Sequence, residues 1–358
     1  MTKFFELKVE AKSGSVAWKS PSNIAIVKYW GKHGNQLPSN PSLSFTLSES
    51  YTSTAVDFDV DPSRRQFELD FKFEGKVAPK FETKIKNFFT KNSADFPYLS
   101  HLKLSVSSEN SFPHSAGIAS SASSMSALAL CMVSIESRMF GGFADKKQFR
   151  TRASHLARLG SGSASRSVFG GLVCWGESES VHESSDYFAV PVNEDVHDVF
   201  ETFQDAILIV DSGQKSVSST LGHKLMVGHP YAEMRYFVAR THVEQLKGIM
   251  QSGDVKAFGK ILENEALALH GLMMNSDPSF ILMKPNTLKI IELIREIRET
   301  EKMPWYFTLD AGPNVHLMYP LEEAKRAEKF IKDALMPFTE NNHVIFDKVG
   351  KGPEKISK

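Results

Sequence analysis

Residues 102–135 read LKLSVSSENSFPHSAGIASSASSMSALALCMVSI, and this stretch decides the fold. Leu102, Leu104 and Val106 alternate with polar residues, which is typical of a strand with one buried face. A segment rich in Ser, Ala and Gly follows, and apolar residues between Met125 and Ile135 then recur at helical spacing. The order of strand, small-residue loop and helix start predicts a mixed fold with helices packed on strands.

The region before this stretch is predicted to be mainly strands. Val56, Phe58 and Val60 alternate with polar residues, Asp61-Pro62-Ser63 interrupts the pattern, and the alternation resumes from Phe67 to Phe73. Two alternating runs separated by a short turn are typical of a β-hairpin. We therefore expect these two strands to pair with each other and to bury one face.

The second half interleaves strands and helices. Residues 206–210 are a continuous apolar run, 315–319 alternate as a strand does, and 290–297 and 327–335 carry apolar residues at helical spacing. With 358 residues the chain is long enough for two domains. A polar stretch near 180–200 predicts the junction, so we expect an α+β protein with domains 1–195 and 196–358.

Composition excludes several classes of protein. Lys plus Arg and Asp plus Glu each total 42, so no net positive charge is available for a nucleic-acid backbone, although a local pocket for a small anion needs only a few cations. The two cysteines, Cys131 and Cys174, lack the spacing of a zinc site or of a disulfide framework. No leader or membrane-spanning run is evident. We expect a cytosolic protein that binds neither nucleic acid nor membrane.

Two segments suggest an anion site. Residues 110–124 combine small side chains with a helix start, where free N–H groups and the helix dipole attract phosphate; plain close packing is the competing interpretation. Lys28 interrupts the apolar run of residues 22–32, so its ammonium group needs either an exposed edge or an anionic partner.

Two further segments carry chemistry. Residues 160–171 surround Arg166 with hydroxyl groups and glycines, which suits a carboxylate or a phosphate, because a guanidinium can bind either through two parallel hydrogen bonds. A solvated linker has a similar composition. Asp310 follows a strand and precedes Ala-Gly-Pro, so it is either a turn former or a group that holds a substrate hydroxyl.

Together these segments resemble the diphosphomevalonate decarboxylase family of the GHMP kinase superfamily. The resemblance spans almost the whole chain, and its first and last motifs are specific to the decarboxylase branch. It rests on NIAIVKYWGK at 23–32, PHSAGIASSAS at 113–123, SGSASRS at 161–167, VSSTLG at 217–222 and DAGPN at 310–314.

The resemblance implies a two-domain GHMP kinase fold, with an N-terminal domain like ribosomal protein S5 domain 2, a C-terminal ferredoxin-like domain and the site in the cleft between them. It implies a homodimer. It also implies an ATP- and Mg²⁺-dependent reaction of the mevalonate pathway, in which (R)-5-diphosphomevalonate is phosphorylated on its 3-hydroxyl, loses that phosphate, and decarboxylates. The products are isopentenyl diphosphate, carbon dioxide, ADP and phosphate.

Residue roles follow from the same resemblance. Asp310 orients or deprotonates the 3-hydroxyl, Lys28 offsets the negative charge, Arg166 holds the substrate carboxylate, and Asn23 holds Arg166. The implied substrate-binding residues are Tyr29, Trp30, Gly31, Lys32, Lys80, Ser161, Gly162, Ser163, Ala164, Ser165, Arg166, Ser218, Ser219 and Thr220. The implied nucleotide-binding residues are Pro113, Ser115, Ala116, Gly117, Ala119, Ser120, Ser121 and Ser123, with Ser121 also the Mg²⁺ ligand.

One departure and three rival functions accompany this expectation. Lys80 stands where the family often has Arg, and a lysine keeps the charge without the guanidinium fork. The rivals are a decarboxylase of 5-phosphomevalonate, a mevalonate 3-kinase-type enzyme and a ligand sensor on a GHMP scaffold. Asp310, Lys28 and Arg166 together argue against the kinase, and an intact Asp310 argues against the sensor. The choice between monophosphate and diphosphate stays open.

Overall fold

The computed structural model describes residues 13–113, 120–192, 195–213 and 219–357. The larger sheet consists of strands from the first half of the chain and of the last strand, β14, in the order β14-β1-β4-β7-β5-β6. In addition, β8 pairs with β4, and β9 pairs with β8. Nearly all neighbours are antiparallel; β5 and β7 are parallel. The strands are β1 Gly14–Val27, β4 Ser42–Val60, β5 Glu68–Phe73, β6 Lys76–Val77, β7 Leu102–Asn110, β8 Leu172–Trp175, β9 Ala189–Pro191 and β14 Glu354–Ile356.

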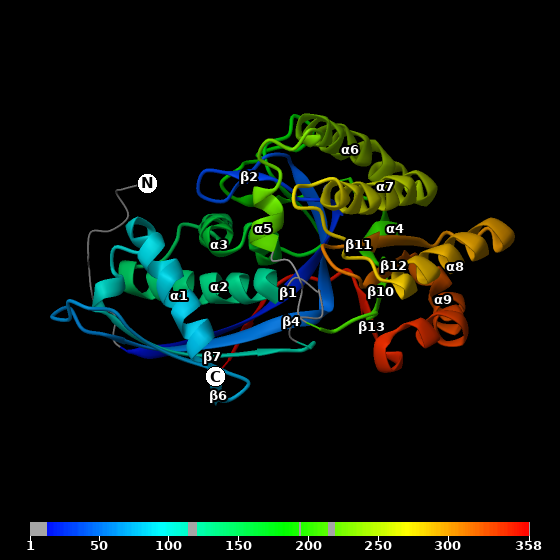
Figure 1. The fold of residues 1–358 in the computed structure, drawn as a ribbon. Helices are drawn as coiled ribbons and strands as arrows, with labels where there is room; N and C mark the ends of the chain where they lie inside the picture. Colours follow the sequence, from blue (N-terminus) through cyan, green and yellow to red (C-terminus); the bar gives the residue numbers. More distant parts are fainter. Residues whose placement is uncertain (1–12, 114–119, 193–194, 214–218, 358) are drawn as a thin grey trace.

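Three helices cover one face of this sheet, as Figure 1 shows: α1 Pro79–Lys91, α2 Ser120–Phe140 and α3 Lys146–Gly160. The predicted strand and helix of residues 102–135 are β7 and α2. Leu102, Leu104 and Val106 of β7 point toward α2 and share one apolar core with it. Helix α2 is buried along most of its length because the sheet, α3 and the 3₁₀ segment Gly162–Val168 all pack on it.

The second half has its own sheet, of four strands in the order β11-β12-β10-β13, all antiparallel. Helices α8 and α9 share the apolar core on one of its faces, while α6 and α7 lie toward the first sheet (Figure 1). The strands are β10 Gln204–Leu208, β11 Tyr306–Leu309, β12 Val315–Tyr319 and β13 Val344–Lys348. The helices are α4 Asp198–Glu201, α5 Ser219–Lys224, α6 Ala232–Ser252, α7 Val255–Met274, α8 Pro285–Glu301 and α9 Ala324–Phe330.

Short elements complete the chain. A two-residue ladder joins β2 Lys32–His33 to β3 Leu37–Pro38. A π-helical turn, Ile331–Leu335, continues α9. Other 3₁₀ turns are Ser93–Asp95, Leu99–His101, Leu321–Glu323, Met336–Phe338 and Glu340–Asn342. The segregation of helices and largely antiparallel sheets confirms the predicted α+β class.

The predicted hairpin of the first half is wrong. Strand β4 pairs with one edge of β7 in the antiparallel direction. Strand β5 pairs with the opposite edge of β7, in the parallel direction. Alternating residues show which face of a strand is buried, but not which strand lies beside it. Strand β7, 40 or so residues later in the chain, has the same alternation and separates the two strands (order β4-β7-β5).

The two sheets are tied together close to the end of the chain. The buried carboxylate of Asp347, on β13, accepts hydrogen bonds from the backbone N–H groups of Ser48, Glu49 and Ser50 on β4, at 2.8–2.9 Å. The chain then crosses back, and β14 pairs with β1 of the first sheet. This connection ties β13 of the second sheet to β4 and β1 of the first.

Candidate active site

Lys28 and Asp310 meet at the junction of the two halves. Lys28 immediately follows β1, and Asp310 immediately follows β11. The Lys28 Nζ atom lies 3.3 Å from Oδ1 of Asp310, and the side chains are 2% and 26% exposed, respectively. Lys28 Nζ also donates to the carbonyl oxygen of Ala25 at 2.6 Å. The ammonium group that interrupts an apolar run is therefore buried and paired, and the carboxylate keeps a face open to solvent.

Burial controls the charge of Lys28. Desolvation lowers the pKa of the Lys28 ammonium group below its ordinary value, and Arg166 lowers it further, while Asp310 and Glu265 raise it. Low polarity strengthens the interaction between the ammonium group and Asp310. The pair is suited to stabilise negative charge that develops beside Asp310.

Arg166 lies in the same region. It is 2% exposed, and its guanidinium donates to Oδ1 of Asn23 at 3.2 and 3.3 Å and to the hydroxyl of Ser42. No carboxylate lies within salt-bridge distance of it among the described residues. Burial lowers the pKa of the Arg166 guanidinium to about 10, and Asp310 opposes this shift. Because a buried cation without a counter-ion is costly, the site is built for an anion.

Asn23 is itself held in place by two hydrogen bonds. Its Nδ2 group donates to the carbonyl oxygen of Ser163 at 3.1 Å and to the hydroxyl of Ser167 at 2.7 Å. The amide oxygen is thereby left to accept from Arg166. The predicted pairing of Asn23 with Arg166 is present in the structure.

Arg166 lies in the 3₁₀ helix Gly162–Val168, and the residues before it differ in burial. Ala164 is in the apolar core, and the Ser165 hydroxyl donates to the carbonyl oxygen of Gly162 at 2.8 Å. Ser161 and Ser163 are only partly buried, and their hydroxyls lie 3.4 Å apart. A Cβ at Gly162 would collide with the rings of Tyr29 and Trp175. The glycine thus allows this loop to pack directly against the segment after Lys28.

That segment, Tyr29 to Lys32, forms an aromatic and cationic strip. Tyr29 and Trp30 both contact the ring of His223 on α5, with centroids 4.3 and 4.8 Å apart. Nδ1 of His223 accepts from the Gly31 N–H at 3.0 Å. Gly31 has a φ of +99°, and a Cβ there would collide with Tyr236, so only glycine fits. The hydroxyl of Tyr29 is buried without a hydrogen-bond partner among the described residues.

Two other lysines act electrostatically on Lys32, at the end of this strip. Burial lowers the pKa of Lys32, and the nearby charges of Lys91 and Lys224 lower it further. Lys91 is in the last turn of α1, whose end is held by a 3.0 Å hydrogen bond from Asn35 to Asn92. Lys80 is exposed in the first turn of the same helix, and 11 residues of helix place it about 17 Å from Lys91.

The predicted nucleotide-binding segment is described in part. Ser121, exposed at the start of α2, has its hydroxyl 3.3 Å from that of Ser161. Ser123 is buried, with its hydroxyl 2.7 Å from that of Thr52 on β4. Pro113 and Ser120 border the undescribed part of this segment. Ser115, Ala116, Gly117, Ala119 and Ser218 lie outside the described residues. Ser219 and Thr220 begin α5, and their side chains are likewise outside the description.

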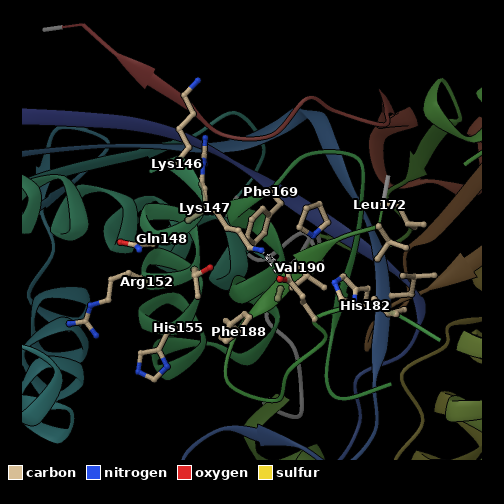
Figure 2. Close-up of a pocket in the computed structure, with 18 of the residues that line it drawn as sticks. Lys146, Lys147, Gln148, Arg152, His155, Phe169, Leu172, His182, Phe188 and Val190 are labelled. Carbon is tan, nitrogen blue, oxygen red and sulfur yellow. Dashed lines mark hydrogen bonds and ion pairs between the residues drawn. The ribbon is translucent and has the colours of Figure 1, made fainter. Parts of the chain in front are cut away.

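A separate cavity of about 1210 Å³ lies over the outer side of α3. Figure 2 shows part of its wall, which includes Lys147 and His155 of α3 together with Phe188 and Val190. Neither Lys28, Arg166 nor Asp310 lines it. Lys147 is already paired with Glu183 across its rim. The size of the cavity does not make it the reactive centre, because the convergent charged groups are elsewhere.

Neither a cluster of metal ligands nor a membrane-spanning helix occurs among the described residues. No group of three or more His, Cys, Asp or Glu side chains that could hold a metal ion occurs among the described residues. Mg²⁺ commonly takes one or two protein ligands together with phosphate oxygens and water, so a single hydroxyl such as that of Ser121 fits its requirements. No described helix is both long and apolar enough to cross a membrane.

Sequence reasoning missed a buried polar network on α6 and α7. Arg235, Glu265 and His270 are almost fully buried, and Glu265 accepts two hydrogen bonds from Arg235. Lys91, Lys224 and His223 were also missed. In the sequence, a charged residue among the regularly spaced apolar residues of a helix indicates a buried charge. It does not show which residue pairs with that charge.

Comparison with known proteins covers both halves. Residues 20–187 match the diphosphomevalonate decarboxylase-like N-terminal domain, and residues 206–356 match the mevalonate 5-diphosphate decarboxylase C-terminal domain. The chain is 31% identical to a diphosphomevalonate decarboxylase of Saccharomyces cerevisiae, across 87% of this chain and 79% of that protein. It is 29% identical to the Candida albicans protein of that name, across 96% and 98%.

Solved structures agree with the described architecture. The structure of MDDEF in complex with MVAPP, AMPPCP and magnesium is 29% identical and superimposes with a TM-score of 0.80, over 97% of this chain and all of that one (100%). A mevalonate diphosphate decarboxylase from Staphylococcus aureus is 28% identical with a TM-score of 0.79, over 96% and 98%. These likenesses extend through both sheets.

Proposed function

The chain belongs to the diphosphomevalonate decarboxylase family, and from this premise we propose how its residues carry out the reaction. It converts (R)-5-diphosphomevalonate and ATP into isopentenyl diphosphate, carbon dioxide, ADP and phosphate. The observation that carries the assignment of the site is the buried Arg166, which lacks an acidic partner among the described residues and lies with Lys28 and Asp310. A decarboxylase needs such a cation to hold the substrate carboxylate.

Phosphorylation of the 3-hydroxyl uses Asp310 and Lys28. The partly exposed Asp310 carboxylate accepts or orients the hydroxyl proton. Lys28, 3.3 Å away, offsets the charge that accumulates as the oxygen attacks the γ-phosphate. Loss of the new phosphate then leaves positive charge at the tertiary carbon, and the electrons of the carbon–carboxylate bond form the double bond as carbon dioxide departs.

Arg166 controls this last step by position. Two oxygens of the substrate carboxylate match the two nitrogens of a guanidinium. Asn23 and Ser42 already hold the guanidinium from one side, so its orientation is set before substrate arrives. A preorganised donor costs no reorganisation during the reaction.

ATP and Mg²⁺ bind near the start of α2. The MDDEF structure was solved with AMPPCP and magnesium, and the exposed Ser121 hydroxyl of this chain suits a Mg²⁺ ligand. Mg²⁺ neutralises the oxygens of the transferred phosphoryl group. Ser120, Ser121 and the small residues of 113–123 provide the N–H groups and hydroxyls for the ATP phosphates.

The substrate diphosphate is assigned to the strip after Lys28. The Tyr29 hydroxyl, which has no partner among the described residues, supplies a buried donor. Ser161 and Ser163 supply hydroxyls, and Lys32 supplies charge together with Lys91 and Lys224. Trp30 and Gly31 belong to the same strip, and Ser218, Ser219 and Thr220 are assigned to the diphosphate through the resemblance alone. Lys80 remains a candidate only through the resemblance.

We also propose the finer features that the resemblance implies. The first is a domain like ribosomal protein S5 domain 2, residues 1–195, and the second is a ferredoxin-like domain, residues 196–358. The site lies in the cleft between them, and β14 from the end of the chain completes the first sheet. A homodimer and a cytosolic location are likewise proposals. Sedimentation velocity tests the dimer, and cell fractionation tests the location.

The deciding experiment is an assay with ATP and Mg²⁺ that follows ADP and carbon dioxide separately. Mevalonate, 5-phosphomevalonate and 5-diphosphomevalonate are offered one at a time. Equal amounts of ADP and carbon dioxide from the diphosphate alone support the proposal. ADP without carbon dioxide, or preference for another substrate, overturns it in favour of a sister enzyme, and binding without turnover indicates a sensor.

A further inference from the structure

Helix α7 contacts the backbone of both members of the Lys28–Asp310 pair. Oε2 of Glu265 accepts from the N–H of Lys28 at 2.8 Å. Five residues later, Nε2 of His270 donates to the carbonyl oxygen of Asp310 at 3.1 Å. Their backbone positions are about 7.5 Å apart along the helix axis. One rigid element thus reaches a residue from each sheet.

The contact with Lys28 is reinforced from α6. Arg235 donates to both oxygens of Glu265, at 2.8 and 2.6 Å, and also to the carbonyl oxygen of Lys28 at 3.0 Å. His242 donates to Glu265 at 2.6 Å. Both backbone polar groups of Lys28 are therefore held by the Glu265–Arg235 ion pair, and Asn40 adds a second donor to the carbonyl oxygen at 3.1 Å.

The contact with Asp310 is directional. A carbonyl oxygen only accepts hydrogen bonds, so His270 carries its proton on Nε2. Burial lowers the pKa of His270 to about 4 and the nearby Lys28 adds to this shift. The ring is therefore neutral at neutral pH and adds no positive charge beside Lys28.

We propose that α7 sets the separation of Lys28 and Asp310, with Glu265 and His270 as positioning residues for phosphoryl transfer. This inference rests on the proposed function. Both catalytic residues lie just beyond the ends of their strands, and misplacement of a reacting group by about 1 Å costs about a hundredfold in rate. A buried ion pair is by itself weak support for stability, so positioning is the more specific use of Glu265.

The first test compares two changes at His270. His270→Gln keeps an N–H donor at the position of Nε2, and His270→Phe keeps the size of the ring without the donor. We expect His270→Phe to lower kcat about tenfold or more, with less than about a threefold change in either KM, and His270→Gln to restore most of kcat. Equal kcat for wild type and His270→Phe, or equal loss in both variants, overturns the proposal.

The second test removes the Glu265 contact. Glu265→Met removes the acceptor for the Lys28 N–H, but alone it leaves Arg235 as an unpaired buried charge that threatens folding, so the double variant Glu265→Met with Arg235→Met is made beside it. The matched control is Glu263→Gln, which breaks the α7 ion pair to Arg298 without touching Lys28 or Asp310. We expect kcat to fall about tenfold in the double variant only. An equal fall in folded Glu263→Gln overturns the proposal.

Crystal structures separate this inference from the reaction itself. We expect the distance from Lys28 Nζ to Asp310 Oδ1 to lengthen by about 1 Å or more in His270→Phe and in the Glu265/Arg235 double variant. This measurement needs no turnover. If the wild-type protein fails to decarboxylate the diphosphate, the proposed function is wrong, but the measured distances still decide the role of α7. If the distances are unchanged in both variants, the role of α7 is wrong even when the wild type is active.

Discussion

Lys28 and Asp310 are 282 residues apart in the chain, yet Nζ of the first lies 3.3 Å from Oδ1 of the second. Each residue follows the last position of a strand, and the two strands belong to different sheets. The pair therefore forms only when both halves of the molecule are packed together. Because the carboxylate is partly exposed and the ammonium group is buried, a substrate reaches Asp310 first and meets the positive charge behind it.

We expect Asp310→Asn to lower kcat by about a thousandfold, since an amide neither takes up the hydroxyl proton nor carries the charge that Lys28 balances. Nucleotide affinity is expected to stay within about threefold, because Asp310 acts mainly on the transition state. Carbon dioxide release measures kcat, and titration calorimetry measures ATP affinity. A kcat near that of the wild type contradicts the assignment of Asp310.

Arg166→Ala is expected to weaken substrate binding and turnover together, with kcat/KM lower by about a hundredfold or more, because the carboxylate loses its partner before and during decarboxylation. Arg166→Lys keeps the charge but not the fork, and we expect only partial recovery. The control is Arg150→Ala, since Arg150 is another arginine for which no ion pair is found among the described residues, and it donates instead to the backbone carbonyls of Val168 and Pro353. Unchanged kinetics in Arg166→Ala place the carboxylate elsewhere.

Much of the fold could be predicted from local pattern, and its strand order could not. Alternation identified β4, β5 and β7 one by one, and helical spacing identified α2 and α8. The neighbour of each strand depends on contacts between distant segments, which is why β7 displaced the expected pairing of β4 with β5. Local periodicity carries no information about such contacts.

The same division applies to the site. Lys28, Arg166 and Asp310 could be named because a motif surrounds each, and the structure brings them together. Glu265 and His270 belong to no motif, and their function depends on which backbone atoms they meet across the sheet junction. A helix with buried polar residues predicts partners without naming them.

The lysines beside Lys32 allow a test between two positions on α1. We expect Lys91→Met to raise KM for the diphosphate about fivefold or more, because removal of a nearby positive charge weakens the local attraction for an anion. Lys80→Met is expected to change KM by less than about twofold, since Lys80 lies about 17 Å away along the helix. High salt should reduce the difference. A larger rise in KM for Lys80→Met than for Lys91→Met contradicts this expectation and supports Lys80 as the diphosphate-binding residue that the resemblance implies.

Mild acid is expected to destabilise the protein through two buried histidines. Burial lowers the pKa of His223 to about 3 and that of His270 to about 4, from an ordinary value of 6.5. Between these values the unfolded chain binds protons that the folded protein refuses, so the free energy of unfolding falls as pH decreases. From about pH 7 to about pH 5 each histidine contributes a loss of about 2 kcal/mol.

Glu265 does not obscure this window. Burial raises the pKa of its carboxyl group, but Arg235 and the hydrogen bonds of His242 outweigh burial and lower the pKa to about 2, so its contribution is lost only below about pH 4.5. Urea unfolding at several pH values measures the slope. In His270→Gln we expect the loss between about pH 7 and about pH 5 to shrink by about half, because one of the two groups no longer titrates. An identical free energy of unfolding at both pH values contradicts the buried, neutral state of these rings.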